Sequence, residues 1–343
     1  VYNKGSSGWW FSRQSVTGLR AVSRITVLYV SFLPPEPYLI AQGLMRNDAM
    51  QLFIGFDVGG THIKHGVINE NGEELTSDEY DTPDDESTFK QKWKAVVDKY
   101  RQEHEIVGIG VSFPGHINHH TGEAAKAGAL DYLDGENLCE LFAQLTDLPV
   151  TTENDANCAA LGERWQGAGK DYEHFVCITI GTGIGGGIVM EGDLYRGSHY
   201  RAGEFGVLPV GNNGEPMHEV ASASGLMKAC RRALAVSEDE MPDGEELFRR
   251  MDSDVHLREA IEEWAHFLSR GIYSVISMFD PQAVLIGGGI SEQEKIYLLL
   301  DKYLQRFEEW EALRVPILPC ELGNQAGRLG AVWLAKQKQA RSA

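Results

Sequence analysis

The sequence predicts an α/β fold built from two related lobes. Apolar runs typical of strands alternate with amphipathic helical patterns along most of the 343 residues, an alternation that indicates sheets covered by helices. A chain of this length is too long for one simple core and suits two lobes. An apolar run, a glycine turn and a second strand occur from residue 52 and again near residue 175. This repeat predicts that each lobe begins with a hairpin.

The first half of the chain predicts strands joined by tight turns, together with one amphipathic helix. Residues 52–56 and 62–68 are apolar runs separated by a glycine turn, and Asn71-Gly72 is typical of a hairpin turn. Residues 88–104 place large apolar side chains on one helical face. Residues 106–111 form a continuous apolar run, so we expect a buried strand there.

The second half begins with a short strand that leads into a helix. Residues 147–152 predict the strand, and residues 156–165 have helical spacing. A long helical pattern follows at 255–279 and stops at Asp280-Pro281, because proline cannot continue a helix. Residues 283–286 are apolar and predict the next strand.

The composition indicates a packed globular protein with neither a nucleic-acid nor a membrane partner. Apolar residues make up 43% of the chain and the formal net charge is −19, whereas nucleic-acid backbones are held by excess Lys and Arg. No apolar stretch approaches the roughly 20 residues that span a bilayer. The five cysteines are scattered without a Cys-x-x-Cys pair, which argues against a disulfide framework and a zinc cluster. We therefore expect a reduced, cytoplasmic protein.

Residues 1–49 differ from the rest of the chain. They carry five Lys and Arg against two Asp and Glu, a net charge of +3, and show no clear hydrophobic period. We expect an irregular leader here, either extra sequence ahead of a start near Met45 or Met50, or a targeting or docking arm. The segment is too short and irregular for a DNA-binding helix-turn-helix.

Three glycine-rich turns, each following an apolar run, predict a nucleotide site. Backbone N–H groups can approach phosphate closely where no Cβ blocks them. A dinucleotide-binding turn would open a helix, but the strand-like run Ile188-Val189-Met190 follows the second turn, which favours ATP. The predicted nucleotide-binding residues of the three turns are Gly59, Gly60 and Thr61; Gly181, Thr182 and Gly183; and Gly287, Gly288 and Gly289.

Asp57 and Asp155 are the carboxylates that phosphoryl transfer would need. Asp57 follows the first apolar run, where it could orient Mg²⁺ through water, since Mg²⁺ keeps several waters and takes one or two carboxylates; the alternative is an Asp that caps the hairpin. Asp155 is the candidate general base beside an acceptor hydroxyl, and the alternative is an ordinary helix cap. Asn154 could fix a neighbouring hydroxyl.

Glu204, His218 and Glu219 are further candidates for substrate binding. Glu204 lies on a glycine-flanked turn, where it could accept hydrogen bonds from two sugar hydroxyls; otherwise it is a solvated turn residue. His218 and Glu219 come just before residues 220–225, which start a predicted helix, and either of them, or neither, contacts a ligand.

Taken together, these motifs resemble the ROK family of bacterial sugar kinases over about residues 51–335. The parts that carry the resemblance are the first phosphate loop at 57–64, the Pro-Gly turn at 110–115, the catalytic motif at 153–157 and the signature at 181–206. The resemblance implies an actin-like, hexokinase-like two-lobed ATPase fold of ribonuclease H-like repeats with an interlobe cleft. It also implies Mg²⁺ and ATP as cofactors, transfer to a sugar hydroxyl, usually on C6, and a homodimer.

The same resemblance assigns roles to single residues. Asp155 would be the base, and Asn154, Glu204 and Gly115 would hold the sugar, while Lys64 would contact the nucleotide. We expect a small N-terminal lobe made of residues 50–158 and 326–343, and a large C-terminal lobe made of residues 159–325.

The chain departs from the family pattern around the sugar. Val207 replaces a histidine that binds zinc and sugar in many members, and residues 211–216 replace a cysteine cluster, so we predict no structural zinc. His218 stands where a sugar-binding glutamate is usual, with Glu219 one step on, and residues 127–133 replace a Pro-Asn-Leu element.

These departures resemble the zinc-less β-glucoside kinases of the family, and residues 153–158 and 163–167 are very similar to theirs. We therefore predict a β-glucoside kinase. The alternatives are a glucokinase, fructokinase or N-acetylmannosamine kinase of the same family, or a non-catalytic sugar-sensing regulator. The short leader and the retained Asp155 argue against the regulator.

Overall fold

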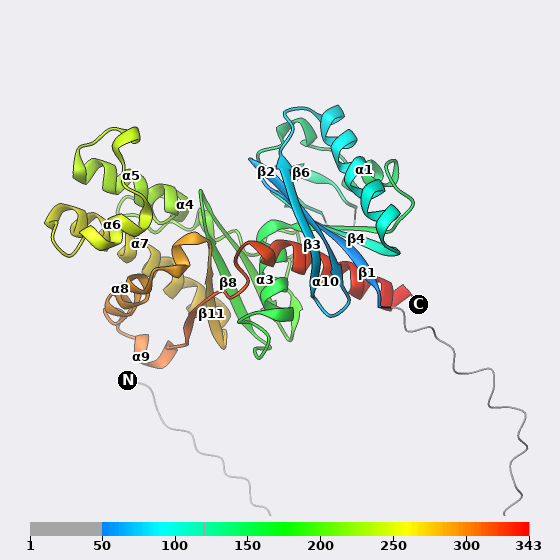
Figure 1. The fold of residues 1–343 in the computed structure, drawn as a ribbon. Coiled ribbons are helices and arrows are strands. Elements are labelled where there is room, and N and C mark those ends of the chain that lie inside the picture. Colours follow the sequence, from blue (N-terminus) through cyan, green and yellow to red (C-terminus); the bar gives the residue numbers. More distant parts are fainter. Residues whose placement is uncertain (1–49, 119–120, 343) are drawn as a thin grey trace, which may run out of the picture. The chain divides into compact units, whose positions relative to one another are not determined.

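The computed structural model describes residues 50–118 and 121–342, which lie within one compact unit. The expected leader, residues 1–49, lies outside the described residues. Two five-stranded sheets organise the described part of the chain (Figure 1).

The first sheet has the strand order β3-β2-β1-β4-β7. Its strands are β1 (Leu52–Val58), β2 (His62–Asn69), β3 (Glu74–Asp81), β4 (Ile106–Phe113) and β7 (Val150–Asn154). β1, β2 and β3 form an antiparallel meander, whereas β4 and β7 run parallel to β1. The predicted Asn71-Gly72 turn joins β2 to β3, with Gly72 at φ +87°.

The second sheet has the order β10-β9-β8-β11-β12 and repeats this arrangement. Its strands are β8 (Phe175–Ile180), β9 (Ile184–Met190), β10 (Asp193–Leu194), β11 (Ala283–Gly287) and β12 (Ile317–Pro319). β8, β9 and β10 are antiparallel neighbours, and β11 and β12 run parallel to β8. The shared order confirms the predicted pair of related halves, each beginning with a hairpin.

Helix α1 (Glu86–Glu103) covers the first sheet and confirms the predicted amphipathic helix. The Asp85 side chain accepts a hydrogen bond from the Thr88 N–H, which satisfies one of the free donors at the helix start. The fully buried Trp93 ring packs against Phe56 and Phe142, with ring centroids 5.2 and 4.6 Å away. Aromatic contacts of this kind anchor the core of the first sheet.

Helix α7 (Val255–Phe279) is the long predicted helix of the second half. It buries an apolar face against the second sheet and against α5 (Ala223–Leu234). The buried Trp264 donates its indole N–H to the Ser222 carbonyl oxygen at 2.9 Å, so the start of α5 is tied to α7.

The remaining elements are short or lie at the edges of the two halves. They are β5 (His116–Ile117), β6 (Ala124–Lys126), α2 (Leu138–Ala143), α4 (Met217–Val220), α6 (Gly244–Arg250), α8 (Glu294–Leu304), α9 (Trp310–Leu313), and the 3₁₀ turns η1 (Asp131–Leu133), η2 (Phe205–Val207), η3 (Glu238–Glu240), η4 (Gly289–Glu292) and η5 (Gly323–Gln325).

Helices α3 (Asp155–Gln166) and α10 (Ala326–Ser342) lie side by side between the two sheets (Figure 1). Their backbones approach so closely that a Cβ on Gly330 would overlap the Cys158 carbonyl, and one on Gly162 would overlap that of Ala326. α10 packs on β1 and β4, and α3 packs on β8 and β9. The division into lobes stays a prediction; its boundary at residue 158 falls within α3.

The buried Glu163 carboxylate links α3 to the segment that precedes α10. It accepts backbone hydrogen bonds from Ala168 at 2.8 Å, Glu321 at 3.1 Å and Leu322 at 2.9 Å. Buried N–H groups need such partners. Glu163 therefore helps to hold the two helices in register.

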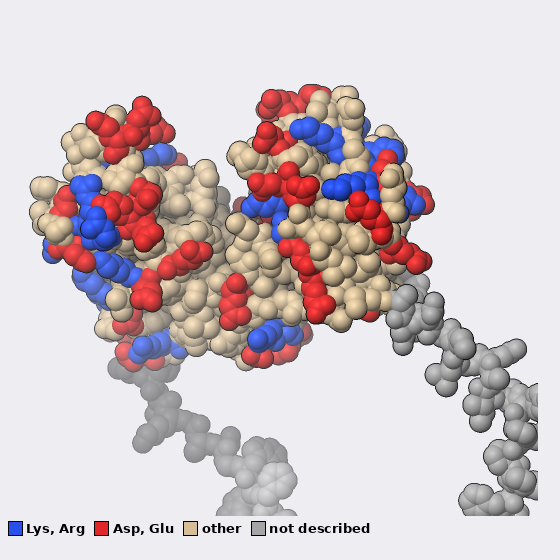
Figure 2. Space-filling view, viewed as in Figure 1, with Lys and Arg blue, Asp and Glu red and all other residues tan. Residues whose placement is uncertain are grey.

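Acidic and basic side chains are intermingled over the face of the molecule that Figure 2 shows. This view contains no broad area of Lys and Arg that a phosphate backbone would need. None of the helices in the described ranges has both the length and the apolar character required to cross a bilayer. The five cysteines are all free, and Cys177 is buried.

Candidate functional site

Asp57 and Gly59, predicted from one motif, and Asp155, predicted from another, line one pocket of about 250 Å³. The pocket lies where β1 ends, α3 begins and α10 begins. Its lining residues are Asp57, Val58, Gly59, Asp155, Ala156, Ala159, Thr179, Gly323, Asn324, Ala326 and Gly327. Thr179 and the residues from 323 to 327 were not predicted, because they carry no motif that marks them in the sequence.

Asp57 is held at the end of β1 by the neighbouring strand and by α10. Ser112 on β4 donates a hydrogen bond to Asp57 Oδ1 at 2.7 Å. A Cβ on Gly327 would lie 2.7 Å from the same oxygen, so glycine is needed to leave room for this carboxylate. Lys64 is directly opposite Asp57 in the β1–β2 register, which places both predicted residues on one face of the sheet.

The turn between β1 and β2 is fixed by hydrogen bonds. The Gly59 N–H donates to the His62 carbonyl at 3.0 Å, and Thr82 donates its hydroxyl to the Gly59 carbonyl at 2.7 Å. A Cβ on Gly60 would come within 2.8 Å of Ala129 Cβ. The turn therefore has the small residues and the rigidity that a phosphate loop requires, with Thr61 exposed at its tip.

The second and third glycine turns lie next to each other. Residues 181–183 join β8 to β9, and residues 287–289 follow β11, the parallel neighbour of β8. Gly288 has φ +90°, and a Cβ there would overlap the Ile180 carbonyl. The Ala223 N–H donates to the Gly181 carbonyl at 3.0 Å, so the second turn is tied to α5. That these turns bind nucleotide stays a prediction.

Asn154, not Asp155, is the cap of α3. Its side-chain oxygen accepts from the Asn157 N–H at 3.1 Å, and its amide nitrogen donates to the Gly115 carbonyl at 2.8 Å. Gly115 has φ +94°, a conformation that favours glycine. The structure thus brings together two predicted sugar-binding residues, and the cap that was the alternative role for Asp155 belongs to its neighbour.

Burial raises the pKa of Asp155 to about 6; the hydrogen bond from the Ala156 N–H opposes the rise, and the charges of Asp57 and Glu204 add to it. Protein surrounds Asp155 densely, yet its side chain is exposed to the pocket, so water there moderates the rise in pKa. A carboxylate with a pKa close to the working pH is suited to general-base catalysis.

Glu153 is a positioning residue that sequence reasoning missed. Its buried carboxylate accepts from Arg196 Nε at 2.6 Å, from Asn157 Nδ2 at 3.0 Å and from the Asn154 N–H at 2.9 Å. These contacts fix the start of α3 and therefore the place of Asp155. No local pattern marks Arg196, which follows β10, as the partner of Glu153.

Glu204 lies at the start of η2 and contacts His116. The sequence analysis did not predict His116 as a site residue. His116 Nδ1 is 3.1 Å from Glu204 Oε1. His116 directly follows Gly115, so this pair lies beside the Asn154–Gly115 contact. Glu204 also contributes to the raised pKa of Asp155, which places the two carboxylates within electrostatic reach of each other.

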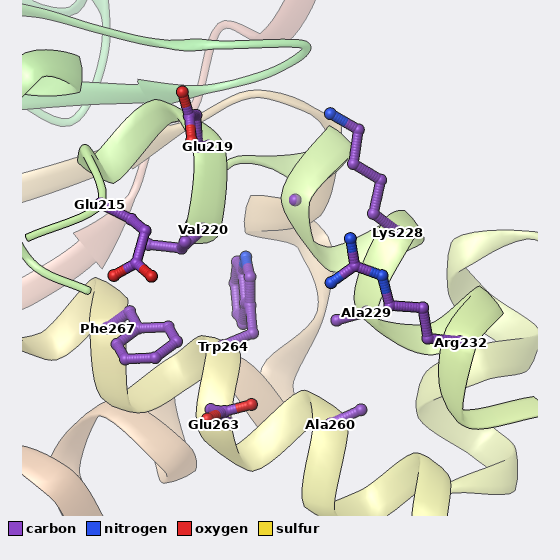
Figure 3. A pocket seen from close by; sticks show the side chains of 11 residues that line it. Glu215, Glu219, Val220, Lys228, Ala229, Arg232, Ala260, Glu263, Trp264 and Phe267 are labelled. Carbon is purple, nitrogen blue, oxygen red and sulfur yellow. The ribbon is translucent and has the colours of Figure 1, made fainter. Parts of the chain in front are cut away.

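His218 and Glu219 lie on α4, and their predicted sugar contacts stay predictions. His218 Nδ1 donates to the Gly206 carbonyl at 2.8 Å, so this ring is anchored behind the Glu204 turn. Glu219 lines a different pocket, of about 430 Å³, between α4, α5 and α7. Figure 3 shows the Trp264 ring and the Arg232 guanidinium directed into that second pocket.

The donor set around Asp57 fits the predicted Mg²⁺. One carboxylate beside glycine turns that can carry phosphate is the usual protein share of such a site. Within residues 50–118 and 121–342, no three His, Cys, Asp or Glu side chains are grouped to hold a metal ion by themselves. The lack of a structural zinc stays a prediction.

A family profile described as ROK matches residues 53–338. The chain belongs to the ROK family. This ROK protein is 37% identical over 294 residues to a β-glucoside kinase of Listeria monocytogenes, covering 83% of this chain and 98% of the relative.

Solved structures share the fold. The Lmo2764 protein of Listeria monocytogenes matches with a TM-score of 0.76 and 34% identity, covering 84% of this chain and 100% of that one. A ROK glucokinase of Streptomyces griseus, in complex with glucose and AMPPNP, matches with a TM-score of 0.71 and 31% identity, covering 83% of this chain and 99% of the other. These likenesses confirm the predicted fold class, an α/β fold of the actin-like, hexokinase type.

Proposed function

We propose that this ROK sugar kinase transfers the γ-phosphoryl group of ATP to the C6 hydroxyl of a β-glucoside. The observation that carries the proposal is the shared pocket of Asp57, Gly59 and Asp155, in which the pKa of Asp155 is raised to about 6. A phosphate turn, a metal-binding carboxylate and a base are the parts that phosphoryl transfer needs.

The residues of the site act on the acceptor hydroxyl, the phosphates and the adenosine. Asp155 accepts the proton of the C6 hydroxyl while that oxygen attacks the γ-phosphorus and ADP leaves. The turns at 59–61 and 181–183 hold the phosphates with backbone N–H groups, Lys64 supports them, and the turn at 287–289 lies along the adenosine. Asp57 would hold Mg²⁺ through water, and the ion, when bound, would supply positive charge to neutralise the phosphates.

The sugar is held by the groups around Asp155. Asn154 and Gly115 are fixed to each other by a hydrogen bond at 2.8 Å, and Glu204 offers carboxylate oxygens to sugar hydroxyls. Val207, three residues after Glu204, is 66% exposed. An exposed apolar side chain here leaves room for a substituent on C1. Together with the β-glucoside kinase relative, this supports a glycoside over a free sugar.

A panel of acceptors in a coupled assay of ADP release tests the substrate. We expect higher kcat/KM for cellobiose and methyl β-glucoside than for glucose, fructose or N-acetylmannosamine. Turnover of free N-acetylmannosamine alone would refute the β-glucoside proposal. Sugar binding without ADP release from any acceptor would favour a sugar-sensing regulator instead.

The pH profile tests the assigned base. We expect kcat/KM to rise with pH through about 6, because Asp155 must lose its proton to act and its pKa lies near that value in the folded protein. Glu204→Gln should move this step to lower pH, since it removes a negative charge that raises the pKa of Asp155. The profile is measured between about pH 5 and 8; a flat wild-type profile would contradict the role of Asp155.

The cellular setting and the assembly belong to the same proposal. Five free cysteines support a reducing, cytoplasmic location. The homodimer rests on the family resemblance.

A further inference from the structure

We propose that His116 is a positioning residue that aligns the Glu204 carboxylate for the sugar. This inference rests on the proposed function, because it assumes that Glu204 holds substrate hydroxyls. His116 carries no motif in the sequence, and the structure alone brings it to the site.

The geometry of the pair shows a contact that is close but not yet aligned. His116 Nδ1 lies 3.1 Å from Glu204 Oε1. The same nitrogen is shielded from solvent and has no hydrogen bond of good geometry among the residues that the structure describes. A buried donor without a partner is costly. A small rotation of either side chain would turn the contact into a charge-assisted hydrogen bond.

The position of His116 suits this role. It follows Gly115, whose carbonyl is fixed by Asn154 at 2.8 Å, so the backbone that carries the imidazole is held at the sugar side of Asp155. His116 starts β5 in the first half of the chain, and Glu204 precedes η2 in the second half. The pair therefore connects the two halves beside the proposed acceptor.

No other described side chain takes this role with Glu204. Val207 is apolar, and His218 Nδ1 already donates a hydrogen bond to the Gly206 carbonyl at 2.8 Å. Both Glu204 and His116 keep about a third or more of their side-chain surface open, 39% and 33%. Part of the Glu204 side chain thus stays accessible to a ligand while the imidazole contacts Oε1.

Two substitutions at residue 116 distinguish the effect of the N–H donor from the effect of lost side-chain volume. His116→Ala removes the donor, and His116→Asn restores a non-titrating N–H donor close to the place of Nδ1. His256→Ala, at a histidine whose side chain is 76% exposed, is the matched control. The measurements are steady-state kcat and KM for the preferred sugar, and the sugar Kd by calorimetry without nucleotide.

We expect His116→Ala to raise KM and Kd about tenfold or more, the usual range for a hydrogen bond to a charged group, with kcat changed much less. His116→Asn should recover most of the affinity, and His256→Ala should behave as wild type. In a Glu204→Gln background, His116→Ala should add little, because its partner is already altered. Unchanged Kd, no rescue by Asn, or fully additive losses would overturn the inference.

The same data separate this inference from the proposed function. If wild type binds sugar but releases no ADP, the kinase proposal fails, whereas the Kd comparison still decides the role of His116. If wild type turns over and the Kd of His116→Ala equals that of wild type, only the role of His116 fails.

Discussion

Asp155→Asn should lower kcat by about 10²- to 10⁴-fold, the range expected when a general base is lost, and leave sugar affinity mostly intact. The amide has nearly the shape of the carboxylate but cannot accept the C6 proton at neutral pH. Asn154 caps α3 independently, through its bond with the Asn157 N–H at 3.1 Å, so the helix start should survive. Turnover is measured by ADP release, and affinity by calorimetry.

Asp171→Asn is a matched control, because Asp171 is exposed in the loop ahead of β8. It should keep wild-type turnover. Loss of sugar binding with retained turnover per occupied site in Asp155→Asn would show that Asp155 binds the substrate and does not act as the base.

Gly330→Ala should lower the free energy of unfolding by about 1–3 kcal/mol or more, as overpacking does. The added methyl group would overlap the Cys158 carbonyl of α3, and a backbone carbonyl can move away only if a helix shifts. Because α3 carries Asp155 and α10 carries Gly327 against Asp57, we also expect kcat to fall. Urea denaturation and ADP release measure the two effects.

Gly244→Ala is the control for this substitution. Gly244 starts α6, and a Cβ there would meet nothing within 4 Å, so alanine should be neutral or slightly stabilising. Equal stability of Gly330→Ala and wild type would mean that α3 and α10 separate easily, contrary to their close packing in the structure.

Local patterns predicted much of the fold. The hairpin repeat, the helix of residues 255–279 and the strands around the glycine turns all follow from periodicity and turn residues close together in sequence. The pairing of α3 with α10 could not be predicted in this way. It depends on Gly162 and Gly330, which are far apart in the chain, and an isolated glycine inside a helical pattern does not reveal its partner.

In the candidate site, too, residues within local motifs were predicted and residues that act through long-range contacts were not. Asp57, Gly59 and Asp155 were predicted because each lies in a motif, and the structure places them at one pocket. Arg196 and His116 were missed, since each acts on a carboxylate from a distant part of the chain, at 2.6 and 3.1 Å. Such long-range pairs follow from the tertiary fold, which brings together loops that carry no signal of their own.

The place of α10 has a consequence for biosynthesis. β1 is the first of the described elements in chain order, yet one of its faces is covered by α10, which is translated after all the others described. Until residues 326–342 emerge, the nascent chain exposes apolar surface of β1 and β4 and lacks the wall that holds Asp57. The pocket that Asp57 and Asp155 line is therefore complete only after α10 has been translated.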